Sequence, residues 1–168
     1  DLGFQRRNNR FNHEFGMSYQ TFEPAGILNK YRVNANVSYN RLYNPNVYER
    51  LRINYNAFFL FKTFDAAGYN GNINPIESYD YYEPRVWGEK LMVPTRMYNE
   101  VWVSSDYRRT LAIDARYGQW SWSEYGLKGR KASISPRIRF TDHLFVRFSY
   151  SPKWIKNDIG WVSEINSN

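Results

Sequence analysis

The sequence has no cysteine, two histidines and no long hydrophobic run. The lack of cysteine excludes disulfide scaffolds, thiolate metal sites and cysteine nucleophiles. No segment reaches the ~18 consecutive apolar residues that a membrane-spanning helix needs. Neither His13 nor His143 has a metal-ligand spacing, and the chain contains no nucleophile elbow and no phosphate-binding glycine loop. We therefore expect neither enzymatic activity nor a cofactor or metal.

Aromatic residues, by contrast, are abundant. Six Trp, fifteen Tyr and eleven Phe make up 19% of the 168 residues, although the mean hydropathy is only −0.72. The hydrophobic share of 42% exceeds that of a disordered tail, and the length fits a single domain. The net charge is +7. A basic, aromatic protein can bind single-stranded nucleic acid, but its arginines can equally line a wet cavity.

Apolar and polar residues alternate along most of the chain, which is the pattern of strands with one apolar and one polar face. This alternation predicts no helix and seven strands, at residues 11–20, 31–43, 51–64, 98–107, 111–117, 132–140 and 144–150. Pro136 removes one backbone donor, so the strand that contains it should be bulged or unpaired there. The second and third strands exceed the usual ~5–6 residues and are long enough to cross a bilayer, which takes ~9–11 residues.

The connections between these strands alternate between long and short. Bacterial outer-membrane barrels have this asymmetry, with short periplasmic turns and longer extracellular loops. The alternation requires that residues 65–96 form one long surface loop without a crossing strand, within a single segment that covers residues 1–168. We therefore predict an all-β fold, an antiparallel up-and-down transmembrane β-barrel in the outer membrane of a Gram-negative bacterium.

Closure of such a barrel needs more strands than this chain supplies. Seven strands do not match the even strand numbers of bacterial barrels, and an open sheet edge in lipid would leave backbone groups unsatisfied. Residues 1–10 lack the apolar segment of a signal peptide, and residues 163–168 form a polar tail. We expect an internal fragment, seven to eight strands wide, of a larger barrel.

The two strand faces predict two sets of site residues. The polar face would line the lumen through Arg32, Asn34, Asn36, Arg52, Asn54, Asn56, Arg116, Arg137, Arg139 and Arg147. The ends of the apolar stripes would form aromatic girdles at the membrane interface, made of Tyr31, Tyr39, Tyr43, Tyr117, Phe140, Tyr150 and Trp154. Aromatic residues also favour strands for packing reasons alone. The arginines either make the lumen selective for anions or pair with carboxylates such as Asp114 and Glu14.

Four sets of short motifs stand out: Asp1-Leu2-Gly3-Phe4 with Arg6-Arg7-Asn8-Asn9, the segment 79–85, the segment 105–109, and Asp158-Ile159-Gly160-Trp161. They resemble parts of a family of large outer-membrane proteins from Bacteroidota. Members of that family carry a periplasmic domain like a family-9 carbohydrate-binding module, followed by a long β-barrel of unassigned function. The resemblance implies that this chain is an internal piece of that barrel, and it transfers no catalytic residues.

Two functions follow from these patterns. The first is a segment of an outer-membrane barrel that acts as a transport pore or as the membrane scaffold of a surface complex. Its partners would be outer-membrane lipid, the rest of the same barrel and other outer-membrane or periplasmic subunits, with no nucleic acid. The alternative is a soluble, basic, aromatic β-sheet module that binds nucleic acid or glycan. Trp120 and Trp122, in an expected loop, would be its glycan contacts.

Overall fold

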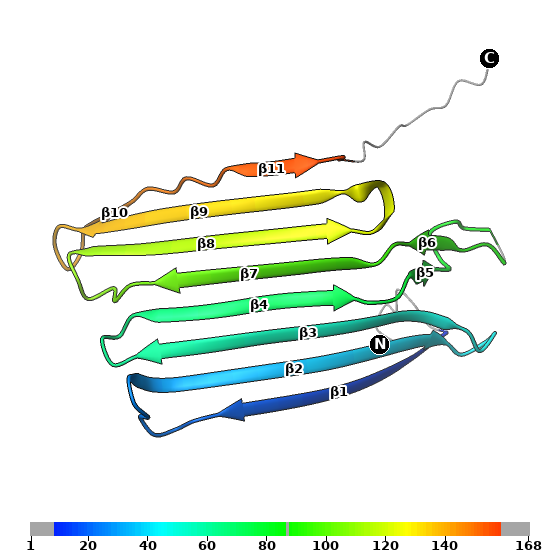
Figure 1. Ribbon diagram of the computed structural model, residues 1–168, viewed down its shortest axis with the longest axis horizontal. Coiled ribbons are helices and arrows are strands. Elements are labelled where there is room, and N and C mark those ends of the chain that lie inside the picture. Colours follow the sequence, from blue (N-terminus) through cyan, green and yellow to red (C-terminus); the bar gives the residue numbers. More distant parts are fainter. Residues whose placement is uncertain (1–8, 87, 159–168) are drawn as a thin grey trace, which may run out of the picture.

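A computed structural model describes residues 9–86 and 88–158, most of which lie in one antiparallel sheet (Figure 1). Its strands are β1 (Arg10–Gln20), β2 (Leu28–Leu42), β3 (Tyr48–Phe61), β4 (Ala66–Asn74), β7 (Arg96–Ser104), β8 (Leu111–Trp122), β9 (Lys128–Arg139), β10 (Phe145–Arg147) and β11 (Lys153–Lys156). A small hairpin of β5 (Ser78–Asp80) and β6 (Leu91–Val93) and a 3-10 helix, η1 (Glu124–Gly126), complete the elements. Within the described part of the chain, no helix is long and apolar enough to cross a membrane.

Neighbouring strands of the main sheet follow one another along the chain, in the order β1-β2-β3-β4-β7-β8-β9-β10. Every pair is antiparallel, so the prediction of an all-β, up-and-down antiparallel sheet is confirmed. Both β10 and β11 pair with β9, and they occupy successive parts of its free edge. The sheet is therefore eight positions wide, with β10 and β11 as two pieces of one interrupted strand.

Proline explains the interruption between β10 and β11. The ladder between β9 and β10 stops at the pair Arg137–Arg147, one residue from Pro136. Pro136 has no N–H to donate and only accepts a backbone hydrogen bond, from Phe148 at 3.0 Å. Pro152 is likewise limited to accepting, from Ala132 at 3.1 Å. The predicted break in pairing at Pro136 is found on the β10–β11 side alone, because on the other side Pro136 pairs with Ile113 of β8 without a register shift.

The prediction of one long loop over residues 65–96 is wrong, because the first part of that segment is a full strand. β4 pairs along its whole length with β7 and along most of it with β3. Its sequence, AAGYNGNIN, has small residues and asparagines where an alternating strand usually has bulky ones, so the period-two signal is weak. The chain returns between β4 and β7 through residues 75–95, which include the β5–β6 hairpin.

The extra strand also changes which connections share an end of the sheet. One end, at the left of Figure 1 and called the left end below, has the connections 21–27, 62–65, 105–110 and 140–144. The right end has the connections 43–47, 75–95 and 123–127. Only the connection 75–95 is long, so the predicted alternation of long and short connections is wrong.

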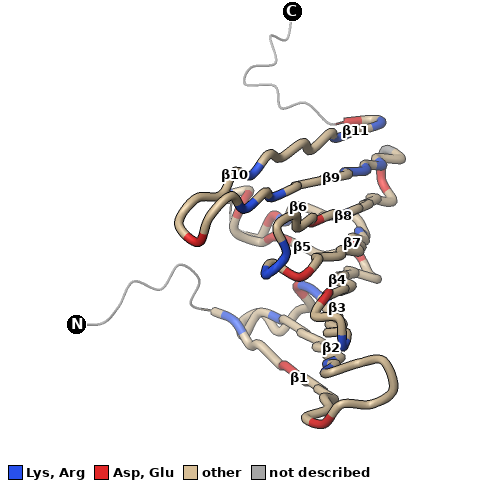
Figure 2. Tube along the Cα trace, turned by 90° about the vertical axis from the view of Figure 1, so that its left-hand side faces the viewer, with Lys and Arg blue, Asp and Glu red and all other residues tan. Residues whose placement is uncertain are grey.

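The sheet is bent into a trough, with β1 and β10 along its two rims (Figure 2). Its register is also staggered. The row of paired residues that starts at Gln20, the last residue of β1, reaches Ser133 in β9, and β9 then continues to Arg139. Curvature and stagger of this kind are what closing a sheet into a barrel requires. The sheet itself is open, and the outer sides of β1 and of β10–β11 have no neighbouring strand among the described residues.

The sheet has almost no interior of its own. Among the described residues, the buried apolar side chains are Leu42, Ala112 and Leu127. The other apolar side chains of the described strands are half-buried or exposed. The described strands therefore enclose almost no hydrophobic core.

Candidate functional site: the two faces of the sheet

The register divides the strand residues into two faces. Directly paired residues share a face, and Asn34 pairs with Asn56 while Asn36 pairs with Asn54. Following these pairs across the sheet places all the predicted lumen residues on one side, called the polar face. The Nδ2 atom of Asn34 donates to Oδ1 of Asn56 at 2.7 Å, so part of this face is internally hydrogen-bonded. That the polar face lines a lumen stays a prediction.

The opposite side, called the apolar face, has exposed side chains at every strand position of the main sheet except β3, where they are half-buried. Phe15 on β1 is 71% exposed and Tyr150, between β10 and β11, is 60% exposed. One polar group on this face is satisfied locally, because Asn99 Oδ1 accepts from the Tyr55 hydroxyl at 2.7 Å and also from the Tyr69 hydroxyl. Charged residues occur on this face only near the right end of their strands, at Arg41, Lys128, Arg130 and Lys156.

The predicted girdle residues all lie on the apolar face, but they lie at different positions along the strand direction. Tyr31 and Phe140 lie toward the left end, and Tyr39, Tyr43 and Trp154 lie toward the right end. Tyr117 and Tyr150 lie in the middle of their strands, where Tyr117 pairs with Val101 and Ala132. Tyr43 contacts Phe11 edge-to-face at 5.2 Å between ring centroids. The rings thus lie at both ends and also at mid-strand.

At the right end of the polar face, four arginines form a group called the arginine cluster, Arg10, Arg50, Arg52 and Arg96. Glu49 is 3% exposed and binds Arg10 with both carboxylate oxygens, at 2.6 Å to Nε and 2.5 Å to a terminal nitrogen. Arg52 and Arg96 flank the fully buried Asn74 in one row of the sheet. The Nε atoms of Arg50, Arg52 and Arg96 are buried and have no hydrogen-bond partner in the described structure.

Sequence reasoning selected only Arg52 from this cluster. Arg10, Arg50 and Arg96 are the first or near-first residues of their strands, at positions that the expected strand bounds left out. The signal that could have found them is parity, because Arg50 is two residues from Arg52 and must share its face.

The predicted pairing of arginines with Asp114 and Glu14 is not observed among the described residues. Asp114 accepts from the Ser104 hydroxyl at 2.6 Å and from the Tyr107 hydroxyl. Glu14 accepts from Asn12 Nδ2 at 2.7 Å. Neutral donors therefore satisfy both carboxylates.

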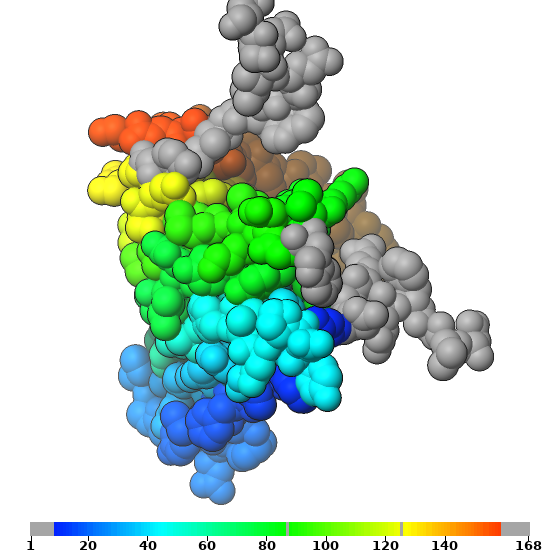
Figure 3. Space-filling view, turned by 90° about the vertical axis from the view of Figure 1, so that its right-hand side faces the viewer, coloured from blue at the N-terminus to red at the C-terminus, as the bar shows by residue number. Residues whose placement is uncertain are grey.

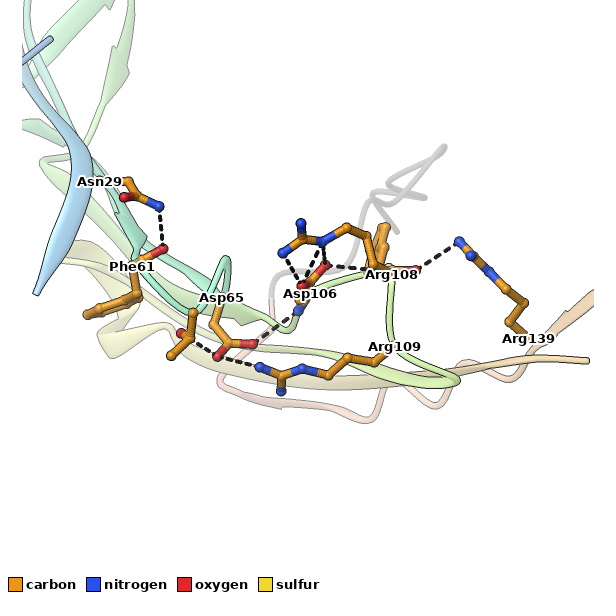
Figure 4. Close-up of polar contacts among 9 residues, drawn as sticks. Asn29, Phe61, Asp65, Asp106, Arg108, Arg109 and Arg139 are labelled. Carbon is orange, nitrogen blue, oxygen red and sulfur yellow. Dashed lines mark hydrogen bonds and ion pairs between the residues drawn. The ribbon is translucent and has the colours of Figure 1, made fainter. Parts of the chain in front are cut away.

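At the left end, two turns are joined by a group of polar contacts called the turn network (Figure 4). Asp65 accepts from Thr63 at 2.7 Å, from the backbone N–H of Asp106 at 3.0 Å and from Arg109 at 3.1 Å. Asp106 accepts from Nε of Arg108 at 2.9 Å and from a terminal nitrogen of Arg108 at 2.7 Å. The segment 105–109, singled out by the sequence, is therefore a structural clamp between the β3–β4 and β7–β8 connections.

Charge and hydrogen bonding shift the acidity of this network. The Arg108 guanidinium and the Arg108 backbone N–H lower the pKa of Asp106 to about 2. The Thr63 hydroxyl and the Asp106 backbone N–H lower the pKa of Asp65. Asp106 in turn raises the pKa of Arg108, whose guanidinium lies 3.9 Å from the centre of the Phe64 ring. These groups stay ionised at neutral pH.

At the right end, the β2–β3 turn and the connection 75–95 lie beside each other (Figure 3). They line an open pocket with a volume of about 720 Å³, whose lining includes Leu42, Val47, Tyr81, Arg85 and Lys90. The Tyr81 hydroxyl donates to the Tyr48 carbonyl at 3.0 Å, and burial raises the pKa of Tyr81. The segment 79–85 thus anchors the connection to β3.

Three predicted features remain to be placed. Trp120 and Trp122 lie in β8 and not in a loop, and both face the polar side. The residues Asp1–Asn8 and Ile159–Trp161 of the terminal motifs lie outside the described residues. In the described ranges, no three His, Asp or Glu side chains come together as ligands for a metal ion.

Comparison with known proteins gives one match. The model of a family described as a domain of unknown function (DUF5916) matches residues 1–168. Searches of curated proteins and of solved structures found nothing similar.

Proposed function

The chain belongs to the DUF5916 family, and we propose that it is a segment of a transmembrane β-barrel in the outer membrane of a Gram-negative bacterium. The observation that carries the proposal is the pair of unlike faces on a sheet without a core. One face is apolar across eight strand positions and exposed on all of them but β3, and the other is polar. A bilayer would cover the apolar face and supply the burial that the sheet lacks.

The position of charge on the apolar face supports lipid as its environment. A charged side chain at mid-bilayer costs about 2–4 kcal/mol, and the cost falls toward the interfaces. Arg41, Lys128, Arg130 and Lys156 lie near one end of the sheet, where they would reach lipid headgroups. The middle of this face has aliphatic and aromatic residues such as Val101, Tyr117 and Ile134, which are 50%, 42% and 47% exposed.

Strand length and edges support the same environment. β2 has 15 residues, β3 has 14, and β8 and β9 have 12 each, against the ~9–11 that span a bilayer at a tilt. The outer edges of β1 and of β10–β11 would have to be paired in lipid, because unsatisfied backbone groups are too costly there. We propose that further strands of the same barrel pair with both edges, as the resemblance to the Bacteroidota family also implies.

In this proposal the polar face lines a water-filled lumen, and the barrel is a transport pore or the membrane scaffold of a surface complex. The arginine cluster would give the lumen a preference for anionic solutes, because rings of charge set pore selectivity. Other outer-membrane or periplasmic subunits are the partners of the scaffold version. The soluble, nucleic-acid-binding alternative has less support, because water-soluble monomers rarely expose apolar patches larger than a few hundred Å².

The test is the behaviour of the protein in membranes and detergent. We expect it in the outer-membrane fraction, extractable only with detergent, and we expect the folded form to migrate differently on SDS gels before and after boiling. Planar-bilayer conductance with a larger permeability for chloride than for potassium would identify the pore version. A folded, monodisperse protein in detergent-free buffer would contradict the whole proposal.

A further inference from the structure

Two tryptophans on the polar face lie flat against the sheet because glycines face them. Trp102 of β7 pairs with Gly68 of β4, and Trp120 of β8 pairs with Gly129 of β9. A Cβ atom on either glycine would overlap the Cε2, Cζ2 and Nε1 atoms of the indole that faces it. Each indole therefore covers the backbone of its glycine with one ring face. The opposite ring face points toward the space above the polar face.

The two indoles are offset both along and across the sheet. In the register of β7 with β8, Trp102 and Trp120 are four residues apart, which is roughly 13 Å at about 3.3 Å per residue. Trp102 leans over Gly68 of β4 and Trp120 leans over Gly129 of β9, three strand positions away, which is roughly 14 Å at about 4.8 Å per strand. Phe58 lies in the same row as Trp102, at 6.0 Å between ring centroids. An extended chain molecule that crosses the strands obliquely would contact both indoles, whereas a single small ring would not.

Beside the two indoles lies a hollow lined by acidic and basic side chains, which can accept and donate hydrogen bonds. The hollow has a volume of about 290 Å³ and is lined by Glu100, Asp114, Arg116, Lys131 and Arg147, together with serines. The serine hydroxyls form two cross-strand pairs, Ser133 with Ser151 and Ser135 with Ser149, each at 2.9 Å. This mixture differs from the arginine cluster, where positive charge dominates.

We propose that the polar face binds an extended, neutral carbohydrate chain, with Trp102 and Trp120 as its stacking platforms. A pyranose ring presents C–H groups on its flat face and hydroxyls around its rim. The faces of Trp102 and Trp120 would accept the C–H groups, while Glu100, Asp114 and Arg116 would exchange hydrogen bonds with the hydroxyls. A nucleic acid would fit less well, because its phosphates would meet the carboxylates of Glu100 and Asp114.

This inference rests on the proposed function only in taking the polar face as an accessible lumen. Lys153 Nζ lies over the free face of the Trp120 ring, 5.4 Å from its centre, so this flexible side chain would move aside to admit a sugar and then donate to its hydroxyls. The carbohydrate would then be a solute that the barrel passes or holds at this site, apart from the anions that the arginine cluster would attract. The aromatic platforms would keep it in contact with the wall while its hydroxyls exchange partners.

The experiment measures binding of three probes, maltohexaose, cellohexaose and chitohexaose, to the intact protein in detergent by isothermal titration calorimetry. We expect at least one hexasaccharide to bind. We expect Trp102→Ala and Trp120→Ala each to weaken that binding by about tenfold, the loss of roughly one aromatic contact. Trp102→Phe should retain most of the affinity. Trp154→Ala, which removes an exposed tryptophan from the apolar face, is the matched control and should bind like the original protein.

Four results would overturn the inference. The first is that none of the three probes binds, and the second is that the Trp102→Ala and Trp120→Ala variants bind a probe as tightly as the original protein does. The third is that the Trp154→Ala control weakens binding as much as these two variants do. The fourth is that an oligothymidylate, and none of the sugars, binds through the same two tryptophans. A protein that still shows heat-dependent migration on SDS gels but binds no probe would refute the carbohydrate site alone. A detergent-independent protein that binds a probe through Trp102 would refute only the membrane barrel.

Discussion

The apolar face of the sheet has exposed rings such as Phe15 and Tyr150, whereas many side chains of the polar face bond to one another. The Glu49–Arg10 pair, the Asn34–Asn56 bond and the serine pairs are internal to the polar face, although the Nε atoms of three of its clustered arginines have no partner in the described structure. Rings lie over glycines on both faces, Trp102 and Trp120 on the polar face and Tyr55 on the apolar face. The two faces therefore differ in polarity and in internal bonding, and not in how their rings cover the backbone.

This contrast indicates where single substitutions should act. A change on the polar face should matter where it breaks an internal partner, and should matter little elsewhere. A change on the apolar face should matter wherever it introduces charge, whatever its neighbours. Four predictions probe this contrast, and the free energies of unfolding refer to the protein folded in detergent or lipid.

The largest effect is expected at Glu49. This carboxylate is almost fully buried and binds Arg10 with both oxygens, next to the other arginines of the cluster. Glu49→Gln keeps the shape but leaves buried positive charge uncompensated, and we expect a loss of about 3–5 kcal/mol in the free energy of unfolding. Urea titration followed by tryptophan fluorescence measures it. Glu14→Gln, on the same face and exposed, is the control and should change the value by less than about 1 kcal/mol.

The second-largest loss of stability is expected from a charge placed in the middle of the apolar face. Val101→Arg would put a guanidinium where the proposed bilayer is driest, and we expect a cost of about 2–4 kcal/mol. Ser18→Arg puts the same side chain at an exposed position of the polar face and should cost far less. The measurement is the fraction of heat-modifiable protein after refolding into lipid vesicles. Equal folding of the two variants would contradict the assignment of the apolar face to lipid.

Replacing a glycine that lies under an aromatic ring should cause a smaller loss of stability. Gly129→Ala would bring a Cβ into the indole of Trp120 and force the ring to move, at a cost of about 1–3 kcal/mol. Gly118→Ala is the matched control, because its Cβ would lie 3.3 Å from the Tyr98 hydroxyl, a contact that a small shift relieves. Thermal unfolding of the two variants compares them. A larger destabilisation by Gly118→Ala would show that the flat indoles are not a structural requirement.

Much of this contrast could be predicted from sequence, because period two is a local property. The alternation of Tyr31 to Tyr39 with the intervening Arg and Asn residues fixes which residues share a face without any tertiary information. The pairing break at Pro136 follows from the missing N–H in the same way. Both predictions hold in the structure, the second on the β10–β11 side alone.

The sequence-based predictions are wrong or incomplete where contacts between residues distant in sequence, and not the local period-two pattern, determine the structure. β4 was missed because Gly68 and Gly71 take the place of bulky strand residues, and the rings that cover them, Trp102 and Tyr55, are distant in sequence. Without β4 the connections were assigned to the wrong ends of the sheet. The partner of Arg10 could not be predicted either, since Arg10 lies in β1 and Glu49 lies in β3, on the other side of β2.

The smallest effect is expected outside both faces, in the turn network. The pKa of Asp106 is lowered to about 2 by Arg108, and that of Asp65 is lowered by Thr63 and the Asp106 backbone. A carboxyl with a depressed pKa in the folded state stabilises it when ionised. Its contribution is fully present above the unfolded pKa of about 3.9 and is lost as the pH falls through about 2.

We therefore expect the thermal midpoint of the intact protein to fall modestly between pH 4 and pH 2, by an amount that added salt reduces because neither carboxylate is fully buried. Asp106→Asn should flatten this part of the pH profile, whereas Asp142→Asn, in the β9–β10 connection, should leave it unchanged. Because these groups lie in the turns, their titration should not alter the response to Val101→Arg or Glu49→Gln. If Asp106→Asn leaves the pH profile unchanged, the acid sensitivity would come from groups on the strand faces. That result would contradict the idea that the turns and the strand faces contribute independently to stability.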